Sequence, residues 1–199
     1  MNNPTQISSI RFSDVEKKNH KYDIVNIFSD NNKIFLNLPK LECPFGITKY
    51  NNNNIDKFSL NLSLDPKNNF NNYNYLENLE DWITDNFLEN KQWLDKLKLD
   101  INSSKKEIKQ CGNSIINIQP NHLPYINLKL IFDNKGDFFC NIFKNIDGKL
   151  TKVQNITEIN DMLYKKFYVT SKIVVSNVWI MEKHYGITLK PKKVVFYNY

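Results

Sequence analysis

The stretch Ser171–Pro191, "SKIVVSNVWIMEKHYGITLKP", contains two apolar runs separated by a polar turn. In the first run, Val174, Val178 and Ile180 share one side of an extended chain and Trp179 lies on the other. Gly186 follows the turn letters "EKHY", where it would supply a positive φ; close approach of a backbone phosphate is the alternative reason for a glycine there. Because apolar alternation continues on both sides, in "KFYVT" and "KKVVFY", we predict β-structure throughout the last third of the chain.

Upstream segments repeat this strand pattern. In "FSLNLSL", residues 58–64, large apolar residues alternate with Ser59, Asn61 and Ser63, which predicts a strand with one dry and one wet face. The pieces "YDIVNIF" and "KIFLNL" also read as strands, the second closed by Pro39. The segment "YINLKLIFDNKGDFFCNIF" predicts a hairpin, because Asn and Gly in "DNKG" tolerate positive φ.

One helix is expected between these groups of strands. Apolar residues recur at three- and four-residue spacing from Leu76 to Leu97, and no Gly or Pro occurs between Tyr73 and Cys111. We predict a long amphipathic helix over residues 76–99 with a break near Asn90, acidic residues in its first turns, and a surface loop over "NSSKKEIKQCGN". The order predicts a single domain, residues 1–199, of α+β class with mainly antiparallel β-structure, closed as a barrel that the helix plugs or flanks.

Composition favours a polyanionic partner. The 199 residues carry a formal net charge of +6, and Arg11 is the only arginine, so lysine supplies nearly all of the positive charge. A basic balance fits nucleic acid, an anionic surface or simple solubility. The many Asn and Lys residues and the lack of alanine are what AT-rich codons would encode. Since reading guanine edges favours arginine, the composition argues against sequence-specific recognition of duplex DNA.

The sequence offers no catalytic or metal-binding motif. It has no phosphate-binding glycine loop, no Rossmann fingerprint and no nucleophile elbow. The histidines and cysteines lack the spacing of metal ligands; they are His20, His122, His184, Cys43, Cys111 and Cys140. An odd number of scattered cysteines fits a reducing compartment. We expect a soluble intracellular protein without signal peptide or membrane helix, which is not an enzyme and needs no cofactor or metal.

Aromatic residues interleaved with lysines are the remaining signal. In the predicted hairpin, Tyr125 and Lys129 face outward on the first strand, and Phe139, Asn141 and Phe143 face outward on the second. Such a face suits single-strand binding, in which bases stack on rings and lysines follow the phosphates. The alternative is that the helix or a loop covers these rings.

Further candidates lie near the C-terminal end. Trp179 could stack a base, although packing under the helix is the leading interpretation. Lys190, Lys192 and Lys193 flank Pro191, which suggests a bulge that directs them toward phosphates; a solvated row that protects a sheet edge is the alternative. The complete set of candidate nucleic-acid-binding residues is Tyr125, Lys129, Phe139, Phe143, Trp179, Lys183, Tyr185, Lys190, Lys192 and Lys193.

Three short motifs in this order resemble a known family: Pro44-Phe45-Gly46, Val178-Trp179 and Tyr185-Gly186-Ile187-Thr188. They resemble the OB-fold single-stranded-DNA-binding proteins of large nucleocytoplasmic DNA viruses (giant viruses), which are similar in turn to the replication single-strand binders of short-tailed phages. The resemblance covers residues 41–197. It departs from the phage proteins at the end of the chain, where "VVFYNY" lacks their acidic tail.

The resemblance implies an OB-fold-like barrel and sequence-independent binding of single-stranded DNA in viral DNA replication, recombination or repair. It also implies viral replication proteins as partners and a location in the host cytoplasm or viral factory. The absence of a long apolar run predicts no membrane association. The oligomeric state is left open between monomer and homodimer. Two alternatives stand beside this function: an RNA-binding or transcription-associated OB module, and a structural or protein-interaction domain without nucleic-acid binding.

Overall fold

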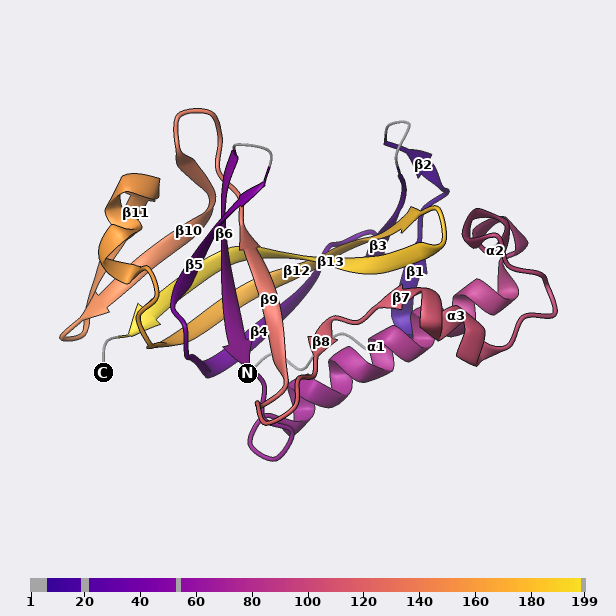
Figure 1. Ribbon diagram of the computed structural model, residues 1–199, viewed down its shortest axis with the longest axis horizontal. Coiled ribbons are helices and arrows are strands. Elements are labelled where there is room, and N and C mark those ends of the chain that lie inside the picture. Colours follow the sequence, from indigo (N-terminus) through magenta and orange to yellow (C-terminus); the bar gives the residue numbers. More distant parts are fainter. Residues whose placement is uncertain (1–6, 19–21, 53–54, 198–199) are drawn as a thin grey trace. The chain divides into compact units, whose positions relative to one another are not determined.

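The computed structural model describes residues 7–18, 22–52 and 55–197, and these form an α+β protein dominated by strands (Figure 1). The chain divides into two compact units. Unit 1 comprises the described residues within Met1–Phe35, Tyr73–Ile115 and Val175–Leu189, and unit 2 those within Leu36–Asn72, Ile116–Val174 and Lys190–Tyr199. Two long strands, β12 (Phe167–Met181) and β13 (His184–Tyr197), contribute residues to both. The α+β class is confirmed, and the single domain over residues 1–199 stays a prediction.

Unit 1 joins a sheet to three helices. Its strands run in the order β1-β3-β12-β13, with β2 on β3 and β7 parallel to β13. Besides β12 and β13, its strands are β1 (Ile10–Phe12), β2 (Glu16–Lys17), β3 (Asp23–Ser29) and β7 (Gly112–Asn113). Its helices are α1 (Phe70–Glu89, most of which lies in this unit), α2 (Lys91–Leu97), α3 (Lys105–Cys111) and the short 3-10 helix η1 (Ile7–Ser9).

The predicted long helix and its break are confirmed. Helix α1 buries Leu76, Leu79, Ile83 and Phe87 at helical spacing, and α2 follows directly. Asn90 separates them because its backbone is extended and its side chain accepts a hydrogen bond from the backbone N–H of Trp93, which caps α2. The helix starts six residues earlier than expected, at Phe70, and the expected acidic first turn is wrong.

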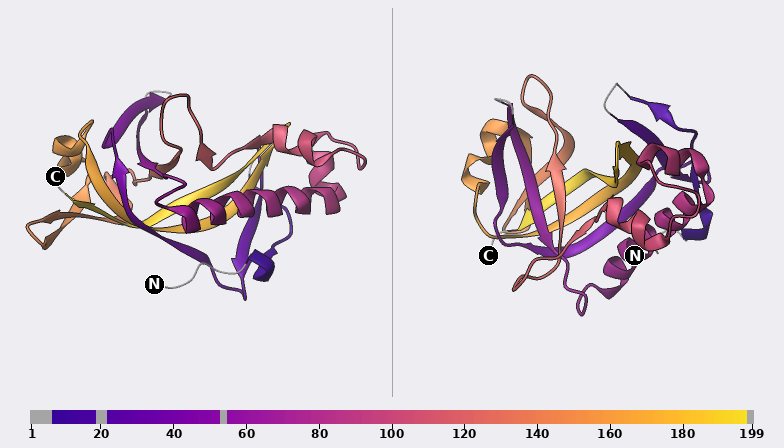
Figure 2. Two further views of the ribbon diagram at one scale, coloured as in Figure 1. Left: turned by 90° about the horizontal axis from the view of Figure 1, so that it is seen from below. Right: turned by 45° about the vertical axis from the view of Figure 1, so that its right-hand side comes forward.

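Aromatic rings form the core between α1 and the strands of unit 1. Phe12 stacks on Trp82 and meets Trp93 edge-on, each at a ring-centroid distance of 4.8 Å. Phe87 packs against Trp93 and, at a ring-centroid distance of 4.4 Å, against Tyr185 near the start of β13. Figure 2 shows the ribbon of α1 running alongside β13. These rings are therefore committed to packing within unit 1.

The loop expected at residues 102–113 is wrong, because it contains helix α3. Ser104 and Glu107 form a reciprocal capping box: the Ser104 hydroxyl accepts from the Glu107 N–H and the Glu107 carboxylate accepts from the Ser104 N–H. Lys105 and Lys109 then pair with Asp85 and Asp81 of α1, each with an N–O distance of 2.5 Å. The polar sequence hid a helix that contacts its neighbour through charges rather than through a broad apolar face.

Unit 2 contains two groups of strands. One has the order β4-β12-β13-β10-β11, in which β10 and β13 are parallel, and the other is a four-stranded antiparallel sheet, β5-β6-β9-β8. The bounds of the strands are β4 (Ile34–Cys43), β5 (Ile47–Asn52), β6 (Ile55–Ser63), β8 (Ile116–Asn117), β9 (Tyr125–Leu130), β10 (Asp137–Ile146) and β11 (Lys149–Asn155). A 3-10 helix, η2 (Ile156–Met162), follows β11.

The predicted hairpin over residues 125–143 is only partly formed. Strand β9 pairs with β6 and β8, whereas β10 pairs with β11 and β13, and a single bridge, Phe132–Phe138, links the two arms beside the turn. Within the described residues the strand orders remain open at their ends, so the expected closed barrel is not formed. The barrel does not close because β9 and β10, the two arms of the predicted hairpin, pair with strands of different sheets.

The predicted strand faces are nevertheless confirmed. Along β9 the apolar residues Ile126, Leu128 and Leu130 are buried, while Asn127 and Lys129 are exposed. Along β10 Cys140 and Ile142 are buried and Phe139 is exposed. Alternation thus fixed which side chains point outward, whereas it could not identify each strand's neighbours. No helix of the described residues is both long and apolar enough to cross a membrane.

Candidate nucleic-acid interface

Positive charge is concentrated in one unit. Counted over their full sequence ranges, the segments of unit 2 contain 15 lysines against 8 acidic residues, a net charge of +7, whereas those of unit 1 contain 12 basic and 13 acidic residues, a net charge of −1. The net charge of +6 for the chain is therefore carried by unit 2 alone. A polyanion would be attracted to unit 2, so its exposed faces are the place to look for an interface.

One face of unit 2 sets lysines against aromatic rings. The Lys40 ammonium lies over the rings of Tyr168 and Tyr197, at 5.2 and 4.8 Å from their centroids. Lys193 lies over the ring of Phe143 at 5.3 Å. We call this surface the lysine–ring face and define it by Lys40, Phe143, Tyr168, Lys172, Lys193 and Tyr197.

Strand register explains why these residues meet. Parallel pairing places Asn141 beside Lys193, Phe143 beside Val195 and Asn145 beside Tyr197, so alternate residues of β10 and β13 share a side. The Thr170 hydroxyl lies 3.4 Å from the Tyr197 hydroxyl and joins β12 to the same surface. A hollow of about 560 Å³ opens here, and its lining includes Lys172 and Lys193 but no carboxylate. The hollow is basic, partly aromatic and free of opposing acid groups.

A second polar surface lies on the four-stranded sheet. Antiparallel register aligns Thr48, Ser59 and Lys129 across β5, β6 and β9, and it places Asn61 opposite Asn127. The Asn127 amide donates to Asn61 Oδ1 at 2.6 Å, and the Thr48 and Ser59 hydroxyls lie 2.9 Å apart. We call this surface the amide face and define it by Thr48, Ser59, Asn61, Ser63, Asn117, Tyr125, Asn127 and Lys129.

The predicted site residues of unit 2 are divided between surfaces. Tyr125 and Lys129 lie on the amide face, and Phe143 and Lys193 lie on the lysine–ring face. The expectation that Tyr125, Lys129, Phe139 and Phe143 share one hairpin face is therefore wrong, because β9 and β10 pair in different sheets. Phe139 is 68% exposed, the largest exposed fraction among the predicted rings.

The three C-terminal lysines are exposed. Lys190, Lys192 and Lys193 lie on β13, and the side chain of Pro191 between them is buried. Strand β13 runs through this proline from His184 to Tyr197. Contact of these lysines with phosphate stays a prediction.

The predicted residues of unit 1 have different surroundings. Tyr185 is only 6% exposed, its hydroxyl lies 3.1 Å from the Thr84 hydroxyl, and its burial raises the pKa of the phenol. Its ring lies in the aromatic core of unit 1, and its predicted role in nucleic-acid binding stays a prediction. Lys183 is exposed in the turn between β12 and β13, and its binding role stays a prediction.

Trp179 is half-buried and explains the neighbouring glycine. A Cβ at Gly186 would lie 2.5 Å from an atom of the Trp179 indole, so a larger residue would collide with the ring. Gly186 has no positive φ, and the turn is instead made with Glu182 at φ 50°. The expectation of a positive-φ glycine is thus wrong, whereas the leading interpretation of Trp179 as a packed residue agrees with this contact.

Sequence reasoning missed several residues, and one of them, Lys40, was missed because β4 is longer than expected. The strand continues through the exposed Pro39 to Cys43, and within the part of the chain that the structure describes its one strand neighbour is β12, so the missing proline N–H is tolerated at a sheet edge. Because the predicted strand ended at Pro39, Lys40 was not recognised as a strand residue. Phe45, Tyr168 and Tyr197 were also missed, although Phe45 stands in one of the quoted motifs and Tyr197 continues the alternation of the last strand.

The described residues contain no cluster of three or more His, Cys, Asp or Glu side chains that could hold a metal ion. Burial raises the pKa of Cys43 to about 12 and that of Cys140 to about 11. Both thiols therefore stay protonated at neutral pH and are poor nucleophiles.

No protein-family model and no curated protein matches the sequence. Among solved structures, the fold is similar to that of the single-stranded DNA-binding protein from bacteriophage Enc34 in complex with ssDNA. The two chains are 11% identical, the superposition covers 92% of this chain and 93% of the phage protein, and the TM-score is 0.48. Similarity at this level does not establish function, so the function proposed below rests on the chain's own residues.

Proposed function

We propose that the protein is a non-enzymatic, sequence-independent single-stranded-DNA-binding protein that uses the surfaces of unit 2. The observation that carries this proposal is the concentration of charge: unit 2 has a net charge of +7 and sets its lysines beside accessible aromatic rings. Rings stack on bases of any identity, and lysines attract phosphates without reading sequence.

The lysine–ring face suits this function best. Phe143 and Tyr197 offer ring surface, while Lys172 and Lys193 line the hollow beside them. In the free protein, cation–π contacts hold the ammonium groups of Lys40 and Lys193 over rings. A bound strand would draw these ammonium groups toward its phosphates, and its bases would take their place over the rings.

The nearly complete use of lysine fits tolerance of sequence. An ammonium group is a compact charge without the planar fork that recognises guanine edges. Affinity would therefore come from stacking and from the release of counterions, so it should decrease steeply as salt increases.

The wider role in this proposal is replication, recombination or repair of a viral genome in the host cytoplasm or viral factory, together with viral replication proteins. Its support is the resemblance of the motifs at residues 44–46, 178–179 and 185–188 to the OB-fold single-strand binders of large nucleocytoplasmic DNA viruses. An OB-like arrangement of the strands belongs to the same proposal.

The test is fluorescence anisotropy of a labelled oligo-dT strand titrated with the protein, with the matched duplex and a matched RNA strand in parallel. We expect tight binding to the DNA strand, little binding to the duplex, and affinity that falls between about 50 and 200 mM salt. No binding to oligo-dT at low salt would overturn the proposal. Tighter binding to RNA would replace it with the RNA-binding alternative, because the 2′-hydroxyl distinguishes the two strands.

A further inference from the structure

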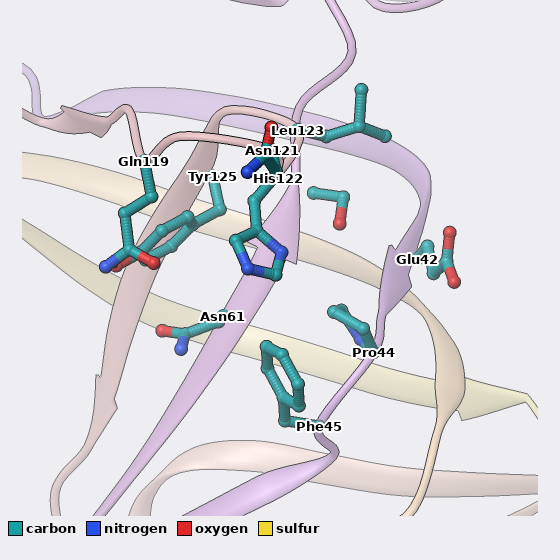
Figure 3. Close-up of a pocket in the computed structure, with 10 residues that line it drawn as sticks. Glu42, Pro44, Phe45, Asn61, Gln119, Asn121, His122, Leu123 and Tyr125 are labelled. Atoms are coloured by element: carbon teal, nitrogen blue, oxygen red, sulfur yellow. The ribbon is translucent and has the colours of Figure 1, made fainter.

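A distinct hollow of about 310 Å³ opens at one end of the amide face (Figure 3). Its walls come from the end of β4 and the turn after it, from β6, and from the segment that leads into β9. Figure 3 shows the imidazole of His122 pointing toward Asn61 and the ring of Phe45, with Gln119 and Tyr125 on one side. The volume lies at the lower end of the range for small-ligand sites, roughly 300–1,000 Å³.

Phe45 is presented to this hollow by a rigid turn. The Gly46 N–H donates to the Cys43 carbonyl, and the Cys43 thiol donates to the Gly46 carbonyl. Gly46 has a φ of +59°, and a Cβ there would lie 2.1 Å from the Lys165 carbonyl oxygen, so only glycine fits. Phe45 itself is 51% exposed, while the backbone of the adjacent Gly46 is fixed by these contacts.

His122 is held over the hollow by a second ordered turn. The His122 N–H donates to the Gln119 carbonyl, Asn121 has a φ of +62°, and the Leu64 N–H donates to the Pro124 carbonyl at 2.7 Å. These contacts fix the backbone on both sides of His122 while the side chain stays exposed. Two rings from separate segments therefore border one space.

Hydrogen-bonding groups in the hollow are only partly used. The Gln119 amide donates to the Tyr125 hydroxyl at 3.2 Å, and Asn61 Oδ1 accepts from Asn127. Within the described residues, the side chains of Asn121 and His122 make no hydrogen bond. The amide nitrogen Nδ2 of Asn61 and the amide oxygen Oε1 of Gln119 make none either. Both donors and acceptors are thus available at the walls.

Charge in the hollow does not oppose a nucleic acid strand. Its one carboxylate, Glu42, is paired with the ammonium of Lys166. Tyr125, Asn127 and Lys129 occupy alternate positions of β9 and therefore lie on the same face of the sheet. A strand that crosses the amide face would meet a lysine before the hollow.

We propose that this hollow holds one unpaired nucleobase of a bound strand, between the rings of Phe45 and His122, with its edge toward Asn61, Gln119 and Asn121. A flat ring with donors and acceptors on its edge matches what the walls offer, because amide side chains present both kinds of group and aromatic rings stack on bases. The inference rests on the proposed function. The pocket would add to sequence-independent binding one position of the strand at which the identity of the base affects affinity.

The test uses short oligo-dT strands that carry a single 2-aminopurine at each position in turn, with fluorescence and anisotropy recorded on the same samples. For the wild-type protein, we expect several-fold quenching at one position. Phe45→Ala and His122→Ala should each remove most of this quenching, and Phe45→Trp should retain it. Phe70→Ala and His184→Ala are matched controls, because both residues are exposed and lie outside the hollow, and both should quench as the wild type does.

The outcomes separate the two proposals. Normal affinity in anisotropy with quenching that survives both Phe45→Ala and His122→Ala would overturn the base pocket and leave strand binding intact. Quenching that disappears in Phe143→Ala rather than in these variants would assign the stacked position to the lysine–ring face and also overturn it. Absence of strand binding by the wild type would overturn the proposed function and the pocket together.

Discussion

The two units contain similar residue types and use them in opposite ways. Unit 1 packs its aromatic rings against one another, with Phe87 fully buried, and pairs Asp81 and Asp85 of α1 with lysines of α3. Unit 2 leaves rings such as Phe45 and Phe139 more than half exposed and carries an excess of lysine. The comparison teaches that aromatic and lysine content alone does not locate an interface, since in unit 1 the same residues stabilise the fold.

The largest expected effect is on the stability of unit 1. Phe87→Ala should lower the free energy of unfolding by about 3–5 kcal/mol, because it removes a fully buried ring and leaves a cavity beside Trp93 and Tyr185. Chemical denaturation measures the loss, and oligo-dT affinity should stay unchanged under conditions where the variant is folded. Weakened strand binding by a folded Phe87→Ala protein would break the division of roles between the units.

The converse substitution in unit 2 should affect binding. Phe143→Ala should weaken oligo-dT binding by about 1–3 kcal/mol, the contribution of one stacked base, because this ring lies beside Lys193 on the lysine–ring face. Phe35→Ala, an exposed ring in unit 1, is the control. Equal affinities for the two variants in anisotropy titrations would show that Phe143 does not stack on the strand.

A smaller effect is expected where α3 contacts α1. Lys105→Ala and Lys109→Ala should each reduce stability by at most about 1 kcal/mol, because both ion pairs are roughly half exposed and screened by water. The reduction should shrink in high salt, and Lys106→Ala, an exposed residue of the same helix, should have no comparable effect. A loss that is independent of salt in thermal unfolding would indicate packing rather than charge pairing.

Local structure could be predicted from the sequence where burial repeats with a fixed period. Alternation identified the outward faces of β9 and β10, and helical spacing identified α1 and the break at Asn90. Helix α3 was missed because only Ile108 is buried in it, so its sequence has no apolar period, although the capping pair Ser104 and Glu107 was a usable signal.

The site was harder to predict than the faces. Placing Tyr125 and Phe143 together required knowledge of which strands pair, and pairing depends on contacts between distant segments that alternation does not encode. Lys40 was hidden by reading Pro39 as a strand end, and the hollow at Phe45 and His122 depends on two turns from separate parts of the chain. The burial of Tyr185 likewise depends on Phe87, almost 100 residues earlier.

The most direct test of the central claim compares charge reversal in the two units. Lys172→Glu/Lys193→Glu in unit 2 and Lys91→Glu/Lys106→Glu in unit 1 make the same change in net charge at exposed lysines. In oligo-dT titrations across a range of salt, we predict that the unit 2 variant binds roughly tenfold or more weakly and that its salt slope falls by about 0.7 for each phosphate that a lysine no longer neutralises. The unit 1 variant should bind nearly as the wild type does. Equal weakening in both variants would contradict the claim that unit 2 carries the interface.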